Sequence, residues 1–344
     1  MYQLAPEWVK QQYILITWPH PYGGWDERLP QVKKTFLAII KAIATRQAVI
    51  VNCYDANVQE EAEKTFMAAG VNLENIRFVV IPTNDTWIRD YGPLSVFKEG
   101  QAYLLDFGFN AWGSKYPYHL DKDYKQQLCS HFADFKRIDC QDFILEGGSI
   151  EVNGQGCLLT TSSCLLTDSR NAGWSKAQIE QHLKPLLGIH TIHWLEQGHL
   201  AGDDTDGHID MLARFCDANT ICYTACNDVN DEHYAALAAM EQEIKQLKNP
   251  QGEAYKCVAL PWPNAKYTAK GRRLPASYSN FLIINGAVLV PIYSVASDGQ
   301  ALNVLQACFP NHEIIGIECS VLIENGGSLH CSTMQIPLLS EGSL

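Results

Sequence analysis

The stretch Glu146-Gly147-Gly148-Ser149-Ile150 places a carboxylate directly before a glycine pair, where a short apolar run begins. A second apolar run, Gly156–Thr161, follows after a turn, which predicts two paired strands behind a polar cluster. The same plan recurs at four other places. These begin at Arg89-Asp90-Tyr91-Gly92-Pro93, Asp206-Gly207-His208-Ile209-Asp210, Ser277-Tyr278-Ser279-Asn280 and Asn325-Gly326-Gly327-Ser328-Leu329-His330-Cys331.

One marker residue from each cluster defines the spacing, and successive markers lie 51 to 72 residues apart. The markers are Asp90, Glu146, His208, Asn280 and Cys331. The other returning strands are expected at Ala102–Asp106, Thr220–Thr224 and Val288–Ile292, and after the last marker only the tail Met334–Leu339 remains. Helical patterns fill the intervals at Tyr124–Phe135, Lys176–Leu187, Glu232–Leu247 and Gln300–Cys308.

No linker rich in Pro, Gly or Ser interrupts this series, so we expect residues 1–344 to form a single domain. Five αβ units of similar size indicate a closed ring. Equivalent positions in a ring converge on its axis, which would bring the five markers into one central cavity. The alternative is that the clusters are unrelated turns, since turns favour Gly and Asp.

The first ninety residues follow an α/β pattern. Strands are expected at Gln12–Trp18, Ala48–Cys53 and Ile76–Ile81, with helices at Gln31–Ala44 and Val58–Ala69. Asn57 is the expected cap of the second helix, and Gly70 its expected stop.

The chain is acidic, because 26 Lys and Arg face 38 Asp and Glu in 344 residues, a formal charge of -12. Such a surface repels phosphate backbones, so we expect no nucleic-acid partner. It favours a small cationic ligand, although solubility alone explains acidity in many proteins. Met1–Trp18 does not resemble a signal peptide, and no apolar run approaches the ~20 residues that span a bilayer. We therefore expect a cytoplasmic protein without a membrane partner.

The twelve cysteines are scattered, and most lie in apolar runs, which is typical of buried, reduced thiols. Cys216, Cys222 and Cys226 form a local cluster that we considered as a metal site. Their spacing lacks the paired Cys-x-x-Cys of zinc modules, so core packing is the favoured interpretation.

Cys331 differs from the other cysteines because it follows a glycine pair and His330. Glycines allow unusual backbone angles and a close approach of substrate to the main chain. His208 and Asp210 are expected in a strand, where residues two apart share a face. A general acid/base and a cation anchor would then lie together. Metal binding by this His-x-Asp pair is an alternative, but no third ligand with suitable spacing is apparent.

The remaining markers each have an ordinary structural explanation. Asp90, in a turn after a strand, could form a local ion pair with Arg89, and Trp87 could be a core aromatic. Glu146 could be a turn residue, and Asn280 an amide at the start of a strand.

Together, however, the markers fit the chemistry of a guanidinium group, which is planar, charged and rich in N–H donors. Two rigid carboxylates, Asp90 and Asp210, could bind it in bidentate fashion. Its central carbon is a poor electrophile, so a thiolate is the best available nucleophile. His208 could protonate the leaving amine and then activate water, with Glu146 favouring its protonated form.

The motifs resemble the agmatine deiminase and bacterial-type peptidylarginine deiminase family, within the guanidine-modifying (pentein) superfamily. The resemblance covers almost the whole chain. It rests on Trp18-Pro19-His20, Asp85–Pro93, Phe107–Gly113, Glu146–Ile150, Thr205–Asp210, Ala276–Phe281 and Gly326–Cys331.

This resemblance implies a five-bladed α/β propeller of repeated ββαβ units, with the site at its axis and neither metal nor organic cofactor. It implies Cys331 as the nucleophile, His208 as the general acid/base with Glu146 as its partner, and Asp90 with Asp210 on the guanidinium. The intermediate would be an S-alkylthiouronium.

Agmatine is the expected substrate, because Asp106–Trp112 resembles the agmatine branch and lacks the arginine pair that peptidylarginine deiminases use for a carboxylate. Trp87, Trp112 and Asn280 are the further residues expected to bind it. Ser328, Leu329 and Met211 depart from the usual agmatine deiminase motifs. Peptidylarginine or free-arginine deiminase activity is therefore an alternative, and an amidinotransferase or a silent ligand-binding propeller are others. The sequence leaves the oligomeric state open, a homo-oligomer included.

Overall fold

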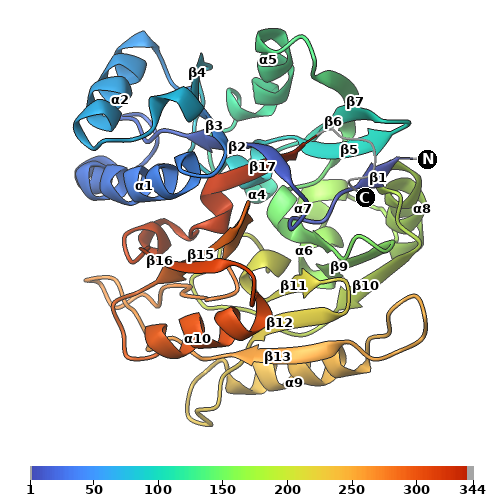
Figure 1. Cartoon of the computed structure of the whole chain (residues 1–344). Helices are drawn as coiled ribbons and strands as arrows, with labels where there is room; N and C mark the ends of the chain where they lie inside the picture. The colour runs from blue at the N-terminus through green and yellow to red at the C-terminus, as the bar shows by residue number, and fades with distance from the viewer. Residues whose placement is uncertain (1, 339–344) are drawn as a thin grey trace.

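The computed structural model describes residues 2–338 and has five small β-sheets around a central axis (Figure 1). In each sheet the first two strands are antiparallel and the third is parallel to the second. A parallel pair needs a crossover, and helices supply it. This is the repeated ββαβ unit of the five-bladed α/β propeller, as the sequence predicted.

The first four sheets contain β5 (Leu94–Lys98), β6 (Gln101–Gly108) and β7 (Lys136–Ile144); β8 (Ile150–Val152), β9 (Cys157–Thr161) and β10 (Thr191–Leu195); β11 (Ala213–Asp217), β12 (Thr220–Thr224) and β13 (Lys256–Leu260); and β14 (Leu282–Ile284), β15 (Ala287–Ile292) and β16 (Glu313–Glu318). Their main crossover helices are α5 (Tyr124–His131), α8 (Lys176–Leu187), α9 (Tyr234–Gln246) and α10 (Asp298–Cys308). A short strand, β1 (Gln3–Leu4), extends the first sheet beside β5. The four predicted returning strands and four helices are thus confirmed, with ends shifted by a few residues.

Both ends of the chain build the fifth sheet, in the order β17-β2-β3-β4. It contains β17 (Thr333–Pro337), β2 (Gln11–Thr17), β3 (Ala48–Cys53) and β4 (Ile76–Val80), with α1 (Leu29–Ala44) and α2 (Ala56–Ala68) as crossovers. The predicted tail strand is therefore β17, although Leu339 lies outside the described residues. Because Thr333 pairs with Ile16 across the antiparallel β17–β2 ladder, the segment just after Cys331 is fixed to the start of the chain.

The two ends of α2 test the expected cap and stop. Asp55, not Asn57, is the N-cap: its backbone is extended and its side chain accepts a hydrogen bond from Val58 N at 2.8 Å. Asn57 already lies inside the first turn of the helix, so the prediction was wrong by two residues. Gly70 ends the helix as expected, because its φ of +66° turns the chain out of the helical path.

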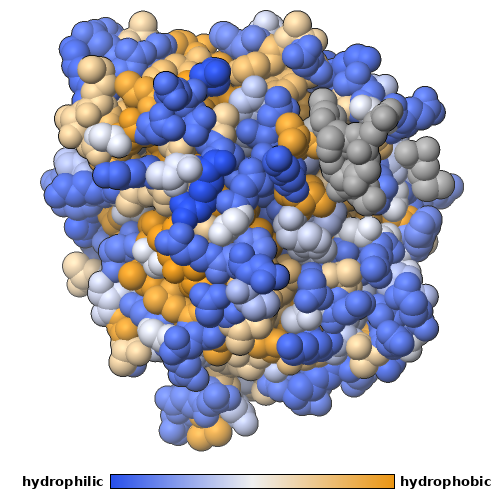
Figure 2. Space-filling model, viewed as in Figure 1, coloured by the Kyte–Doolittle hydropathy of each residue, from blue (hydrophilic) through white to orange (hydrophobic). Residues whose placement is uncertain are grey.

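Apolar residues at helical spacing cover the inward face of α1, where Val32, Phe36, Ile39 and Ile43 are fully buried. They pack with the central strands of the fifth sheet in one continuous core. On the face seen in Figure 2, hydrophilic residues predominate and hydrophobic ones lie in scattered groups. None of the helices within residues 2–338 is long and apolar enough to cross a membrane.

Candidate active site at the propeller axis

The five marker residues occupy equivalent places, in the turn just before the first strand of each sheet. Asp90 lies in the one-turn helix α3 (Ile88–Tyr91), and Cys331 in the 3-10 turn His330–Ser332. Glu146, His208 and Asn280 precede β8, β11 and β14. All five are at least 95% buried. The repeat in the sequence therefore positions five side chains from distant segments around one axis.

Asp90 is held by two donors. Its Oδ2 accepts a hydrogen bond from Trp112 Nε1 at 2.9 Å, and its Oδ1 accepts one from Gly148 N at 3.0 Å. Burial raises the pKa of Asp90 to about 6. Arg89 does not pair with it, because the Arg89 guanidinium points instead to Gln335 and to the His330 carbonyl. The local ion pair considered from the sequence is therefore excluded.

An unusual turn presents Trp112. Ala111, Trp112 and Ser114 have φ angles of 50°, 55° and 62°, and Gly113 has 92°, so four successive residues are left-handed. This conformation costs roughly 1–2 kcal/mol for each non-glycine residue. Such strain at a residue that contacts the site is typical of functional loops.

Asp210 is the second carboxylate of the site. Its Oδ2 accepts a hydrogen bond from His330 Nδ1 at 2.7 Å, while its Oδ1 has no partner among the described residues. Burial opposes ionisation, but His330 and His208 lower the pKa of Asp210. The expected strand was wrong: His208 is the N-cap of a 3-10 turn over Ile209–Met211, and Asp210 lies within that turn.

His208 lies between two carboxylates. Its Nδ1 is 3.6 Å from Asp90 Oδ1, and its Nε2 is 3.7 Å from Glu146 Oε2. Burial opposes its charge, but Asp90 and contacts with Cys164 and Glu146 raise the pKa of His208 well above its ordinary value. Within residues 2–338 neither ring nitrogen has a hydrogen-bond partner, so both are free to exchange protons with a ligand.

Sequence reasoning missed Arg170, which fixes Glu146. Arg170 Nε lies 2.9 and 2.8 Å from the two Glu146 oxygens, and the same guanidinium donates to Asp206 and to the Thr205 carbonyl. Arg170 is far from every quoted motif, and only its contacts reveal it. Despite the opposing effect of burial, His208 and Arg170 lower the pKa of Glu146.

Cys331 Sγ lies 3.3 Å from Asn280 Nδ2 and 3.8 Å from Asp210 Oδ2. Burial and the two nearby carboxylates, Asp210 and Asp90, raise the pKa of Cys331 well above its ordinary value. These effects favour the neutral thiol form of Cys331.

His330 ties the site to a buried ionic network that the sequence did not reveal. Its Nε2 is 2.7 Å from Glu7 Oε2, and that carboxylate also pairs with Arg214 at 3.0 Å. Glu7 accepts a further hydrogen bond from Ile283 N at 2.7 Å. The imidazole thus links Asp210 to the first turn of the chain and to two other sheets.

Two glycines of the quoted motifs allow these groups to approach. A Cβ atom on Gly148 would lie 2.6 Å from His208 Nδ1 and 3.0 Å from Asp90 Oδ1. A Cβ atom on Gly327 would lie 2.7 Å from the Trp87 ring. Both positions require glycine because any side chain would displace a residue of the site.

A cavity of 380 Å³ reaches part of this group. Of the residues predicted for the site, Cys331, Asp90, Trp87 and Trp112 line it, whereas Glu146, His208, Asp210 and Asn280 are not among its lining residues. Its other walls carry Gly23, Gly24, Asp85, Tyr116, Asp204, Thr205, Arg272, Glu324, Asn325, Gly326 and Gly327. Burial raises the pKa of Asp85 to about 7. Acidic side chains outnumber basic ones around the cavity, so it suits a cation.

Glu146, Cys164 and His208 lie close enough together to share a metal ion. Both oxygens of Glu146 already accept from Arg170, however, and that fixed positive charge opposes a cation at this place. The group is better suited to proton transfer than to metal binding.

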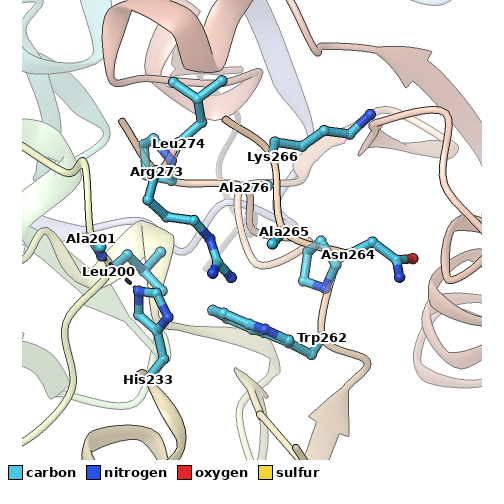
Figure 3. A pocket seen from close by; sticks show the side chains of 12 residues that line it. Leu200, Ala201, His233, Trp262, Asn264, Ala265, Lys266, Arg273, Leu274 and Ala276 are labelled. Carbon is cyan, nitrogen blue, oxygen red and sulfur yellow. Dashed lines mark hydrogen bonds between the residues drawn. The ribbon is translucent and has the colours of Figure 1, made fainter. Parts of the chain in front are cut away.

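A small pocket, shown in Figure 3, joins two segments whose neighbouring residues line the cavity. His233 Nε2 accepts a hydrogen bond from Ala201 N at 2.8 Å, and its Nδ1 contacts Asp231 at 2.7 Å. Asp231 also accepts from Trp262 Nε1 and from Arg273. These hydrogen bonds hold Ala201 and Arg273, which are close in sequence to the cavity residues Asp204 and Arg272. The pocket itself, about 10 Å³, has room for roughly one water molecule and no substrate.

Comparison with known proteins decides between the families that share such sites. The family model described as Porphyromonas-type peptidyl-arginine deiminase matches residues 3–337. The chain belongs to this family. An agmatine deiminase from Pseudomonas aeruginosa is 31% identical to it, over 98% of this chain and 95% of the relative.

Two solved structures are similar to almost the whole chain. An agmatine deiminase from C. jejuni with substrate bound has a TM-score of 0.91 and 37% identity, covering 99% of this chain and 98% of its own. A protein from Porphyromonas gingivalis, provisionally named an arginine deiminase, has a TM-score of 0.91 and 43% identity, covering 98% of each chain.

Proposed function

We propose that the protein is an agmatine deiminase, which hydrolyses agmatine to N-carbamoylputrescine and ammonia. The observation that carries the proposal is the cluster of Asp90, Asp210, His208 and Cys331 beside an acidic cavity that Asp90 and Cys331 line. The relatives with this activity by name support it. We also propose that the whole chain acts as one catalytic domain, since both its ends complete the fifth sheet.

Asp90 and Asp210 are proposed to bind the guanidinium from two sides. The unpartnered Oδ1 of Asp210 is ready to accept an N–H donor, and Asp90 is oriented by Trp112 and Gly148. Bidentate contacts of this kind fix the plane of a guanidinium as well as its position. The reactive carbon would then face Cys331 Sγ, which lies 3.8 Å from Asp210.

The bound cation would also activate the nucleophile. The charges of Asp210 and Asp90 contribute to the raised pKa of Cys331, and a guanidinium between them offsets both charges. The thiol then gives its proton to solvent as substrate binds, and the thiolate attacks the guanidinium carbon. His208 donates its proton to the departing ammonia, which leaves an S-alkylthiouronium.

Hydrolysis reverses the role of His208. The neutral imidazole takes a proton from water, the resulting hydroxide adds to the thiouronium carbon, and the C–S bond breaks to release the ureido product. Glu146 is proposed to orient the imidazole and to favour its protonated form, while Arg170 holds Glu146 in place. Asn280, 3.3 Å from Cys331 Sγ, would stabilise the thiolate.

The cavity walls favour agmatine because it carries a second positive charge. Asp85, Asp204 and Glu324 line the outer cavity, where the far end of the substrate would lie. Arg272 lines it too, and this favours one competing function, deimination of free or peptidyl arginine, whose carboxylate it could bind. Arg272 already donates to the Glu324 carbonyl at 2.9 Å, which makes that function the second candidate.

Ammonia release from agmatine, free arginine and an arginine-ended peptide separates the two candidates. The carboxylate of an arginine substrate would lie unpaired among these acidic groups, which costs several kcal/mol of binding free energy. We therefore expect kcat/KM for agmatine to exceed the values for the other two substrates by about 100-fold or more. Arg272→Gln should leave that preference unchanged. Equal or greater turnover of the peptide, or of free arginine, would overturn the agmatine assignment in favour of the second candidate.

We further propose a cytoplasmic location. All twelve cysteines are free, and the proposed chemistry needs a reduced thiol. Reducing compartments maintain thiols in this state.

A further inference from the structure

Three cysteine thiols meet on the outer side of the propeller, away from the residues of the catalytic cavity. Cys216 Sγ lies 2.8 Å from Cys222 Sγ, and Cys222 Sγ lies 3.5 Å from Cys308 Sγ. All three sulfur atoms lie within 4.8 Å of one another. Cys226, which the sequence had grouped with the first two, points elsewhere, to the Asp228 carbonyl.

The cluster joins two adjacent sheets. Cys216 and Cys222 come from the paired strands β11 and β12: Arg214 pairs with Cys222, and Cys216, two residues further on, shares its face. Cys308 is the last residue of α10, the crossover helix of the next sheet, which lies beside β12 (Figure 1). Cys216 and Cys222 are buried in the core, as the sequence predicted, and Cys308 brings a third thiol to them from the next sheet.

We propose that Cys216, Cys222 and Cys308 form a three-thiolate site for a soft metal ion, with Cu(I) the ion that fits best. Thiolates select soft ions, whereas structural zinc sites hold four protein ligands. Among the described residues the group contains three such ligands and no fourth. Cu(I) accepts three-coordinate sulfur, which makes the ligand count favour it over zinc.

The three sulfur atoms need only a small change of position to hold a metal ion. With metal–sulfur bonds of about 2.3 Å, sulfur atoms in a planar three-coordinate site lie about 4 Å apart. Rotation of the Cys216 side chain would open the 2.8 Å contact to that spacing. Cys308 is half-buried and offers the route of entry, while Cys216 and Cys222 are buried.

Negative charge at the bound site needs a nearby cation. Each thiol gives its proton to solvent as its bond to the metal forms, so three thiolates and Cu(I) leave a charge of two minus. Lys256, on the neighbouring strand β13, is close enough to stabilise negative charge at Cys308.

The test is titration of the reduced, metal-free protein with Cu(I) against a chromogenic competitor. It uses a Cys331→Ala background, so that the catalytic thiol cannot bind the ion. We expect one Cu(I) per chain, three sulfur ligands at about 2.3 Å by X-ray absorption, and a higher Tm because the ion joins two sheets. Cys308→Ser should weaken binding by at least about 10- to 100-fold and remove the Tm increase.

Cys257→Ser is the matched control, because Cys257 is a half-buried thiol of the same sheet outside the cluster. It should bind Cu(I) like the background protein. Equal affinity in the Cys308→Ser protein, or only two sulfur ligands, would overturn the proposal. A Cys216–Cys222 disulfide that persists under reducing conditions and prevents binding would overturn it as well. None of these outcomes depends on agmatine turnover.

Discussion

Replacement of Trp112 by Phe tests how Asp90 is kept ionised in a buried site. The change removes the 2.9 Å hydrogen bond from Nε1 to Asp90 Oδ2 but retains an aromatic ring beside Phe109. Hydrogen bonds to a charged group contribute about 1.5–3 kcal/mol. At 1.36 kcal/mol per pKa unit, the loss should raise the pKa of Asp90 by about one to two units.

The direction of the pH effect follows from the form of Asp90 that binds a cation. Activity requires the carboxylate, so kcat/KM for agmatine should fall as the pH drops through the pKa of Asp90, which is about 6 in the native protein. In Trp112→Phe this fall should begin about one to two pH units higher. Near pH 7 the variant should therefore be about two- to tenfold slower, and it should recover most of this loss at pH 9.

The assay is ammonia release from agmatine at low substrate concentration between pH 5 and 9. Trp174→Phe is the matched control, because Trp174 packs on Phe143 outside the catalytic cavity, and its pH profile should be native. A loss of activity in Trp112→Phe that is the same at every pH would refute the reasoning. Trp112 would then only fill space.

Two further substitutions test the supports of the site. Arg170→Gln leaves the Glu146 carboxylate buried without its partner, so urea unfolding should show a free energy of unfolding lower by about 3–5 kcal/mol. A free energy within about 1 kcal/mol of the native value would contradict the role of this ion pair. Gly327→Ala should displace the Trp87 ring and lower kcat/KM for agmatine at least about tenfold. Gly299→Ala, where a Cβ meets open space, is the control and should keep the native kcat/KM. Equal activity of the two variants would show that the Gly327 contact is unimportant.

The sequence predicted the parts of this protein that repeat. Alternating apolar runs identified β3 (Ala48–Cys53) and β12 (Thr220–Thr224) to the residue, because hydrophobic periodicity reports burial directly. The spacing of polar clusters predicted that five marker residues would share one cavity, and of these Asp90 and Cys331 line it. Residues from distant segments come together here because the repeated units close into a ring, which local preferences for helix or strand do not predict.

Long-range contacts were beyond the reach of the sequence. Arg170 and Glu7 show no local pattern, and each acquires its role from partners that come near only in the folded chain. The strand expected at His208–Asp210 failed because tertiary contacts favour a tight turn there. The helix cap failed by two residues, since Asp55 and Asn57 are equally good caps by composition.

The central claim is that the ring makes Cys331 the one thiol that attacks substrate. Rapid acid quenching during turnover of agmatine, followed by peptide mass spectrometry, tests it most directly. We predict a substrate-derived adduct on the peptide that contains Cys331, and neither adduct nor ammonia release from Cys331→Ala. Continued turnover by Cys331→Ala, or an adduct on Cys164 beside His208, would contradict the account.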